Sequence, residues 1–90
     1  MAILDVRTTE EYHSPTGRLL NALLIPVDEL ASRADELDGL KDKIILVYCR
    51  SGIRSRRACE ILSGQGFKTL NLEGGILRWL GESLAVVRDK

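Results

Sequence analysis

The chain has 90 residues, of which 44% are apolar and 29% are charged, a composition typical of a folded soluble domain. The length allows one hydrophobic core and excludes a second, so we expect residues 1–90 to form a single domain. Thirteen basic residues balance thirteen acidic ones, and this net charge of zero provides no general attraction to nucleic acid or to anionic membranes.

The N-terminal part of the chain contains two short apolar runs and one helix start. Residues 3–6 predict a buried strand. Thr8 and Glu11 then have the spacing of a capping box, which predicts the start of a short helix. Residues 23–25 form the second apolar run, which a proline ends, and they predict another strand.

The middle of the chain contains the longest helical pattern and the strongest strand. Apolar residues recur at helical spacing over residues 27–37, which predicts an amphipathic helix that ends near Gly39. Residues 44–48 are apolar, β-branched or aromatic on both faces. Such a run is typical of a central strand in a parallel sheet.

The remaining elements continue the same alternation. Residues 58–62 predict part of a helix, residues 69–72 a strand and residues 76–80 a short helix. Strands alternating with helices predict an α/β fold with a central, mostly parallel sheet of about four strands. Reactive loops in such sheets gather at the carboxyl ends of the strands, and Cys49 directly follows the best strand.

The loop after Cys49 can stabilise a sulfur anion. It leads into a helix, whose first N–H groups and positive dipole end favour negative charge. Gly52 allows the backbone to curl so that several N–H groups point toward one anion. Arg50 and Arg54 add positive charge. We therefore interpret Cys49 as a nucleophile, although a lone cysteine at a strand end is more often a small core residue.

The other cysteine and arginines of this region have simpler interpretations. Cys59 lies within the predicted helix and should pack at its edge. Arg56 and Arg57 should be solvated on the outer face of that helix. Two cysteines are too few for a disulfide scaffold, and the single histidine, His13, is far from both in the sequence, so we expect no metal and no cofactor.

Four segments of the sequence together resemble one protein family. They are Leu4-Asp5-Val6-Arg7 with Glu11-Tyr12, residues 17–26 (GRLLNALLIP), residues 47–55 (VYCRSGIRS), and Leu72-Glu73-Gly74-Gly75-Ile76 with Trp79. In this order they are similar to the motifs of single-domain rhodanese-like sulfurtransferases, over about residues 3 to 80.

The resemblance implies a rhodanese-like three-layer fold and sulfur transfer through a persulfide on Cys49. It also implies that the loop binds the substrate, through Arg50, Ser51, Gly52, Ile53, Arg54 and Ser55. Asp5 and Arg7 would help to frame the pocket. For these two residues, an ion pair that holds the turn after the first strand is an equally good interpretation.

Two details of the sequence bear on the substrate. Four residues separate Cys49 from Arg54, whereas family members resembling phosphatases and arsenate reductases have one more, so a phosphatase is disfavoured. Glu11 occupies a position that is arginine in two-domain members, which weakens the case for thiosulfate.

Two other departures from the family concern the fold. Arg18 replaces the usual histidine, in a turn that should lie far from the chemistry. Family members also usually carry one more strand and helix before residue 3, so one sheet edge should be uncovered, which favours a homodimer.

The function expected from the sequence is transfer of sulfane sulfur from a donor such as thiosulfate to a thiol or cyanide. The alternative is a persulfide carrier or interaction module with little turnover of small donors. A protein thiol such as a thioredoxin-like protein is a further expected partner, and nucleic acid and membranes are not. The first residues do not form a secretory signal, and no apolar run reaches about 18 residues, so we expect a cytoplasmic protein.

Overall fold

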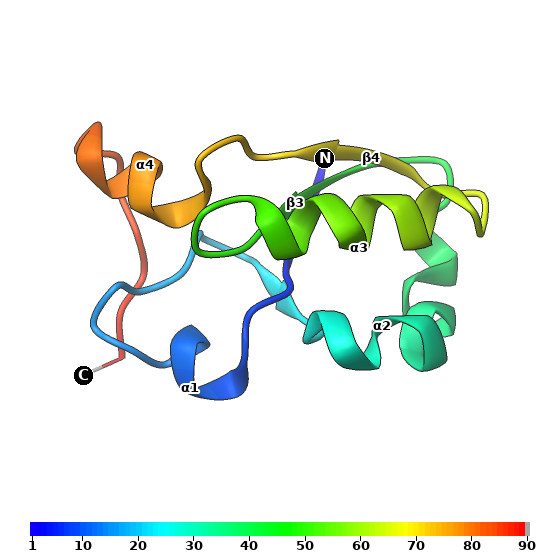
Figure 1. Cartoon of the computed structure of the whole chain (residues 1–90), viewed down its shortest axis with the longest axis horizontal. Helices are drawn as coiled ribbons and strands as arrows, with labels where there is room; N and C mark the ends of the chain where they lie inside the picture. Colours follow the sequence, from blue (N-terminus) through cyan, green and yellow to red (C-terminus); the bar gives the residue numbers. More distant parts are fainter. Residues whose placement is uncertain (90) are drawn as a thin grey trace.

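The structure, a computed structural model, describes residues 1–89. In chain order its elements are β1 (Ala2–Asp5), α1 (Thr9–Tyr12), β2 (Leu23–Leu24), α2 (Val27–Arg33), the 3₁₀ helix η1 (Ala34–Leu40), β3 (Ile44–Tyr48), α3 (Ile53–Ser63), β4 (Lys68–Asn71) and α4 (Gly75–Gly81) (Figure 1). The predicted strands and helices are all present, and the ends of the strands lie within one residue of the predicted ones.

The four strands form one parallel sheet in the order β2-β1-β3-β4. This arrangement confirms the predicted α/β fold, with the apolar strand β3 in the interior of the sheet. Because all strands run the same way, the segments that follow β1, β3 and β4 leave the sheet at the same edge. Cys49 follows β3 at that edge.

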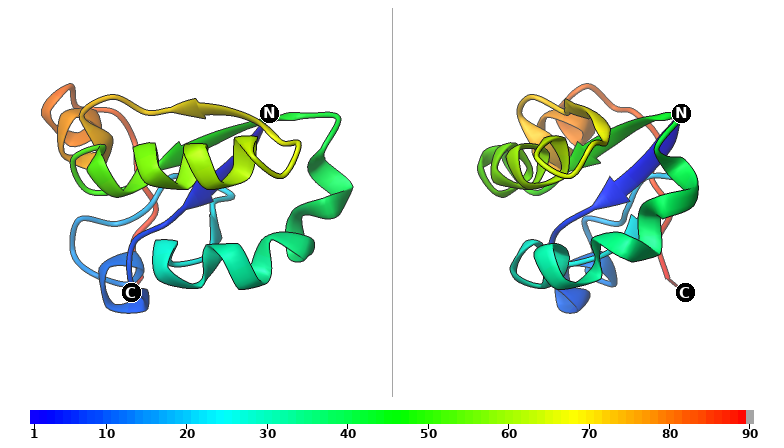
Figure 2. Two further views of the ribbon diagram at one scale, coloured as in Figure 1. Left: turned by 45° about the vertical axis from the view of Figure 1, so that its right-hand side comes forward. Right: turned by 90° about the vertical axis from the view of Figure 1, so that its right-hand side faces the viewer.

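The alternation of side chains along the strands divides the apolar residues between two cores. Leu4, Ile45 and Val47 point to the face that α2, η1 and α3 cover, and there they pack with residues such as Leu30 and Leu62. The helices α2 and α3 also contact each other on this face (Figures 1 and 2). Cys49 comes two residues after Val47, so its side chain points to the same face of the sheet and packs in this larger core.

The opposite face of the sheet has a smaller core. Tyr48 and Ile76 are fully buried there, and Leu19 and Ala22 are buried as well. The hydroxyl oxygen of Tyr48 accepts a hydrogen bond from the backbone N–H of Leu19 at 3.1 Å. Trp79 of α4 packs against this cluster and is only half-buried.

The helix predicted for residues 27–37 is divided in two. The α-helix ends at Arg33, and a 3₁₀ helix continues to Leu40. Asp and Gly have low helix propensity and are frequent in the second part. Its apolar residues Ala34, Leu37 and Leu40 recur every third residue, which matches the 3₁₀ repeat and turns all three toward the core.

The segment after α4 folds back across the molecule, which the sequence pattern did not predict. It returns from α4 to the end of the molecule where α1 lies (Figure 2). Val87 forms an antiparallel bridge with Arg18, through hydrogen bonds of 2.9 and 2.7 Å. Asp89 makes ion pairs with His13 and Arg18. Within residues 1–89, none of the helices has the length and apolar character needed to span a bilayer.

Candidate functional site

The loop from Cys49 to Gly52 joins the carboxyl end of β3 to the first turn of α3 (Figure 1). Cys49 is 1% exposed, so its sulfur lies beneath the loop rather than on the surface. Gly52 caps α3 with a φ of +107°, in the left-handed region that favours glycine. This conformation turns the backbone N–H groups of the loop toward the sulfur.

The sulfur of Cys49 lies in a cradle of hydrogen-bond donors. The backbone N–H of Gly52 donates to Sγ at 3.0 Å, and that of Ser55 does so at 3.4 Å. The Ser55 hydroxyl lies 3.4 Å from Sγ. Ser55 is itself fully buried. The predicted anion-binding nest at the start of α3 is therefore present, and it is directed at the cysteine.

The cradle changes the acidity of the Cys49 thiol. Burial would by itself raise the pKa of Cys49, because it disfavours the charged thiolate. Hydrogen bonds from the Ser55 side chain and from the backbone of Ser55, Gly52 and Ser51 outweigh burial and bring this pKa below its ordinary value. A larger fraction of Cys49 is therefore the nucleophilic thiolate at a given pH than for an ordinary cysteine.

Helix α4 holds the loop from the other side. The N–H of Ile76 donates to the carbonyl of Cys49 at 3.0 Å, and that of Leu77 to the carbonyl of Arg50 at 3.2 Å. Gly75 has a φ of +59°, and a Cβ atom at this residue would lie 2.6 Å from the Cys49 carbonyl oxygen. The first turn of α4 thus fixes two loop carbonyls, which leaves the N–H groups free to face Sγ.

Asn71, the last residue of β4, supports the cradle and was not among the predicted site residues. Its side-chain oxygen accepts a hydrogen bond from the Ser55 hydroxyl, and its amide nitrogen donates to the carbonyl of Gly52 at 3.3 Å. Asn71 therefore ties the two residues that contact Sγ to the sheet. Its position at the carboxyl end of a parallel strand next to β3 was the available signal.

The two loop arginines have different environments. Arg54 makes a bidentate ion pair with Glu11 of α1, with distances of 2.6 and 2.8 Å. The side chain of Arg50 is exposed and makes no ion pair within the described part of the chain. Ser51 and Ile53 are also exposed at the mouth of the loop, where an incoming substrate can contact them.

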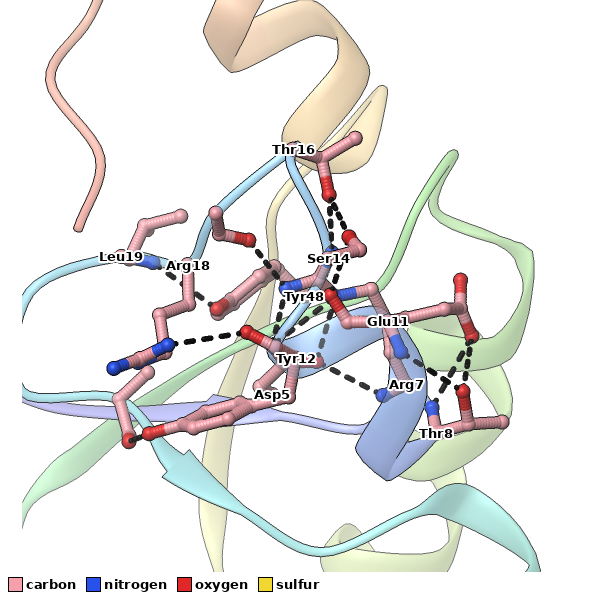
Figure 3. Close-up of polar contacts among 12 residues, drawn as sticks. Asp5, Arg7, Thr8, Glu11, Tyr12, Ser14, Thr16, Arg18, Leu19 and Tyr48 are labelled. Carbon is pink, nitrogen blue, oxygen red and sulfur yellow. Dashed lines mark hydrogen bonds and ion pairs between the residues drawn. The ribbon is translucent and has the colours of Figure 1, made fainter. Parts of the chain in front are cut away.

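Asp5 and Arg7 form a buried ion pair whose polar atoms are occupied (Figure 3). The guanidinium donates to the Asp5 carboxylate at 2.7 to 3.1 Å, to Thr16 and to the carbonyl of Gly17. Burial lowers the pKa of Arg7, but its hydrogen bonds and charge contacts with Asp5 outweigh burial and raise it overall. Both side chains are at most 1% exposed, which favours the ion-pair interpretation over contact with a substrate.

A surface hollow lies beside the loop, on the side of α4. It is lined mainly by α4 and the segments on either side of it, including Leu72, Trp79 and Leu84, and Cys49 does not line it. Gly75 lines this hollow, and it also lies against the carbonyl groups of Cys49 and Arg50. The exposed loop residues Arg50, Ser51 and Ile53 lie outside this hollow.

The second cysteine and the acidic residues provide no further centre. Cys59 is half-buried in α3, packs against the larger core and forms no disulfide. Burial raises the pKa of Cys59, so a smaller fraction of Cys59 than of Cys49 is thiolate at a given pH. Across residues 1–89, no group of His, Cys, Asp and Glu side chains is arranged to hold a metal ion.

Known proteins resemble this chain in sequence and in fold. The Rhodanese-like domain family model matches residues 1–82. The Bacillus subtilis relative YtwF is 41% identical over 81 residues, which are 90% of this chain and 75% of that protein. A protein of Allochromatium vinosum named a sulfurtransferase is 38% identical over 86 residues, with 94% of this chain and 77% of the relative covered.

A solved structure has the same fold as this chain. The crystal structure of a rhodanese-related protein from Thermoplasma volcanium has a TM-score of 0.89 and 36% sequence identity, and the match covers 98% of this chain and 84% of that one. With the fold, the position of the cysteine loop and these relatives in agreement, the chain belongs to the rhodanese-like family.

Proposed function

We propose that the protein is a sulfurtransferase that carries sulfane sulfur as a persulfide on Cys49. The observation that supports this most strongly is the cradle of Gly52 and Ser55, whose N–H groups contact Sγ at 3.0 and 3.4 Å. The donors that stabilise a thiolate also suit the terminal sulfur of a persulfide, which is anionic at neutral pH. The same loop thus serves both states of the cysteine.

The transfer takes place in two displacements. The Cys49 thiolate attacks the outer sulfur of the donor, the bond between that sulfur and the rest of the donor breaks, and its electron pair leaves with the departing group. With thiosulfate the products are Cys49–S–S⁻ and sulfite. An acceptor thiolate or cyanide then attacks the terminal sulfur and regenerates the Cys49 thiolate, so no outside oxidant or reductant is needed.

A persulfide carrier with little turnover of small donors is the second candidate. The ion pair between Arg54 and Glu11 favours it, because it reduces the positive charge available to a small anionic donor. A carrier would accept sulfur from a persulfide-bearing protein and pass it to another protein thiol. It would give near-background rates with thiosulfate and cyanide.

Mass spectrometry after incubation with a sulfur donor tests the proposed function. One added sulfur atom should appear on Cys49 and disappear when a thiol acceptor is added. Cys49→Ser should abolish the adduct, whereas the matched variant Cys59→Ser should retain it. No adduct from thiosulfate or from any persulfide donor would rule out both the enzyme and the carrier.

A further inference from the structure

Glu11 reaches the cysteine loop from a separate element of the fold. It lies on α1, 43 residues before Arg54, and its two carboxylate oxygens accept from the two terminal nitrogens of that arginine. The two side chains are 27% and 35% exposed, so the pair lies at the accessible side of the loop rather than in the core. A substrate that approaches Arg54 therefore meets the carboxylate as well.

The carboxylate of Glu11 is fixed in this position by the start of α1. Its Oε1 atom also accepts from the backbone N–H of Thr8 at 3.1 Å and from the Thr8 hydroxyl at 3.2 Å, and the capping box is complete (Figure 3). The hydrogen bond from Arg54 is the main cause that lowers the pKa of Glu11 to about 2. Glu11 thus remains charged at any working pH.

The ion pair between Glu11 and Arg54 weakens the electrostatic attraction of the loop for a doubly charged donor. Arg54 carries one positive charge, and the bidentate carboxylate neutralises it. A dianion such as thiosulfate would experience the repulsion of Glu11 together with the attraction of Arg54. Within residues 1–89, Arg50 is then the one loop arginine that makes no ion pair, and solvent screens its exposed side chain.

We propose that Glu11 is a specificity-determining residue that selects against dianionic sulfur donors and leaves the Cys49 site to persulfide sulfur carried by a thiol. This inference rests on the proposed function. With such a donor, R–S–S⁻ and the Cys49 thiolate give Cys49–S–S⁻ and R–S⁻, and the donor carries one negative charge rather than two. The departing group is a thiolate with a single charge rather than sulfite, so it needs less positive charge at the mouth of the loop.

Glu11→Gln tests this role with little change to the fold. Glutamine has the same shape, can still accept from Arg54, and is itself a usual residue at this capping-box position. Glu10→Gln is the matched control. It removes the same charge from the neighbouring residue of α1, which is exposed and makes no ion pair within the described residues.

The measurement is the rate of Cys49 persulfide formation with two donors, thiosulfate and 2-hydroxyethyl persulfide, followed by mass spectrometry. Glu11→Gln should raise the thiosulfate rate by about tenfold and change the rate with the other donor by less than about twofold. The gain should shrink as salt is added, because screening weakens the charge effect. Glu10→Gln should leave both rates unchanged.

The outcomes separate this inference from the proposed function. An unchanged or lower thiosulfate rate in Glu11→Gln, with adducts forming normally from the second donor, would overturn the inference and leave the function standing. An equal gain for both donors would also overturn it, because Glu11 would then act on Cys49 rather than on donor charge. No adduct from either donor in any of the proteins would instead refute the proposed function.

Discussion

The hydroxyl of Ser55 has two partners in the cradle. It donates to the side-chain oxygen of Asn71, and it lies 3.4 Å from Sγ of Cys49. When the thiol loses its proton, the hydroxyl can turn to donate to the thiolate. Among the hydrogen bonds that lower the pKa of Cys49, the one with the Ser55 hydroxyl comes from a side chain. The others come from backbone N–H groups.

Removing that hydroxyl should shift the pH dependence of the first sulfur transfer. The thiolate is the reactive form, so the rate falls as the pH drops below the pKa of Cys49. In Ser55→Ala one stabilising bond is lost while burial is unchanged, so this pKa should rise and the fall in rate should move to higher pH by about one unit. Single-turnover persulfide formation from pH 5 to 10 measures the shift.

The control for this variant is Ser63→Ala at the exposed end of α3. Its pH profile should match that of the unaltered protein, because its hydroxyl contacts Thr69 rather than the cysteine. An unshifted profile in Ser55→Ala would show that the backbone donors alone set the acidity of Cys49.

The sequence indicated the candidate nucleophile more readily than the residues around it. Cys49 was predicted from a local pattern, since an apolar strand followed by a glycine-containing loop and a helix places a residue at the reactive edge of the sheet. Asn71 and Glu11 come close to the loop through the packing of β4 and α1. No spacing rule connects Glu11 with a residue 43 positions later, so this pair required the structure.

The ion pair of Asp5 and Arg7 joins β1 to the turn before α1 and to the segment of Thr16 and Gly17. Arg7→Met should lower the free energy of unfolding by about 3–5 kcal/mol, because it leaves a buried carboxylate without a partner. Urea unfolding followed by Trp79 fluorescence measures this loss.

The same variant distinguishes a structural role from a substrate-binding one. The folded fraction of Arg7→Met should form the Cys49 persulfide at nearly the normal rate, since the pair is buried and its donors are occupied. A double variant with Asp5→Asn should lose less stability than the two single changes added together. A folded Arg7→Met protein whose rate falls by a hundredfold would instead support contact with the substrate.

Local sequence rules worked best where one interaction dominates an element. The capping box of Thr8 and Glu11 predicted the start of α1, and it is present. The helix predicted for residues 27–37 shows the limit of such rules. Helical spacing indicated that Leu30, Ala34 and Leu37 face the core, but it did not predict that the α-helix ends at Arg33 and continues as a 3₁₀ helix to Leu40.

For the whole molecule, the order of strands and helices was enough to predict the parallel sheet and the edge that carries Cys49. The course of residues 84–89 was not predictable, because this segment has neither a helical nor a strand repeat. It is held by contacts with Trp79 of α4, which is near in the sequence, and with residues 13–18, which are far from it. The carbonyl of Ala85 accepts from the Trp79 indole at 2.8 Å, and Arg88 donates to the carbonyl of Pro15 at 2.7 Å.

Removing residues 84–90 should therefore weaken the fold without removing the site. The change deletes the bridge between Val87 and Arg18 and uncovers part of the smaller core, so the free energy of unfolding should fall by about 2 kcal/mol or more. Trp79 is the single tryptophan, and its emission should shift to longer wavelength as its indole becomes more exposed to water.

A point variant of the full chain checks that the returning segment itself causes the loss. Val87→Pro removes the N–H that donates to the Arg18 carbonyl at 2.7 Å, so it should destabilise in the same direction by a smaller amount. Both proteins should still form the Cys49 persulfide, because the loop is held by α4, β4 and α3 rather than by the segment after α4. Loss of the adduct from a folded, truncated chain would show that the segment also supports the loop.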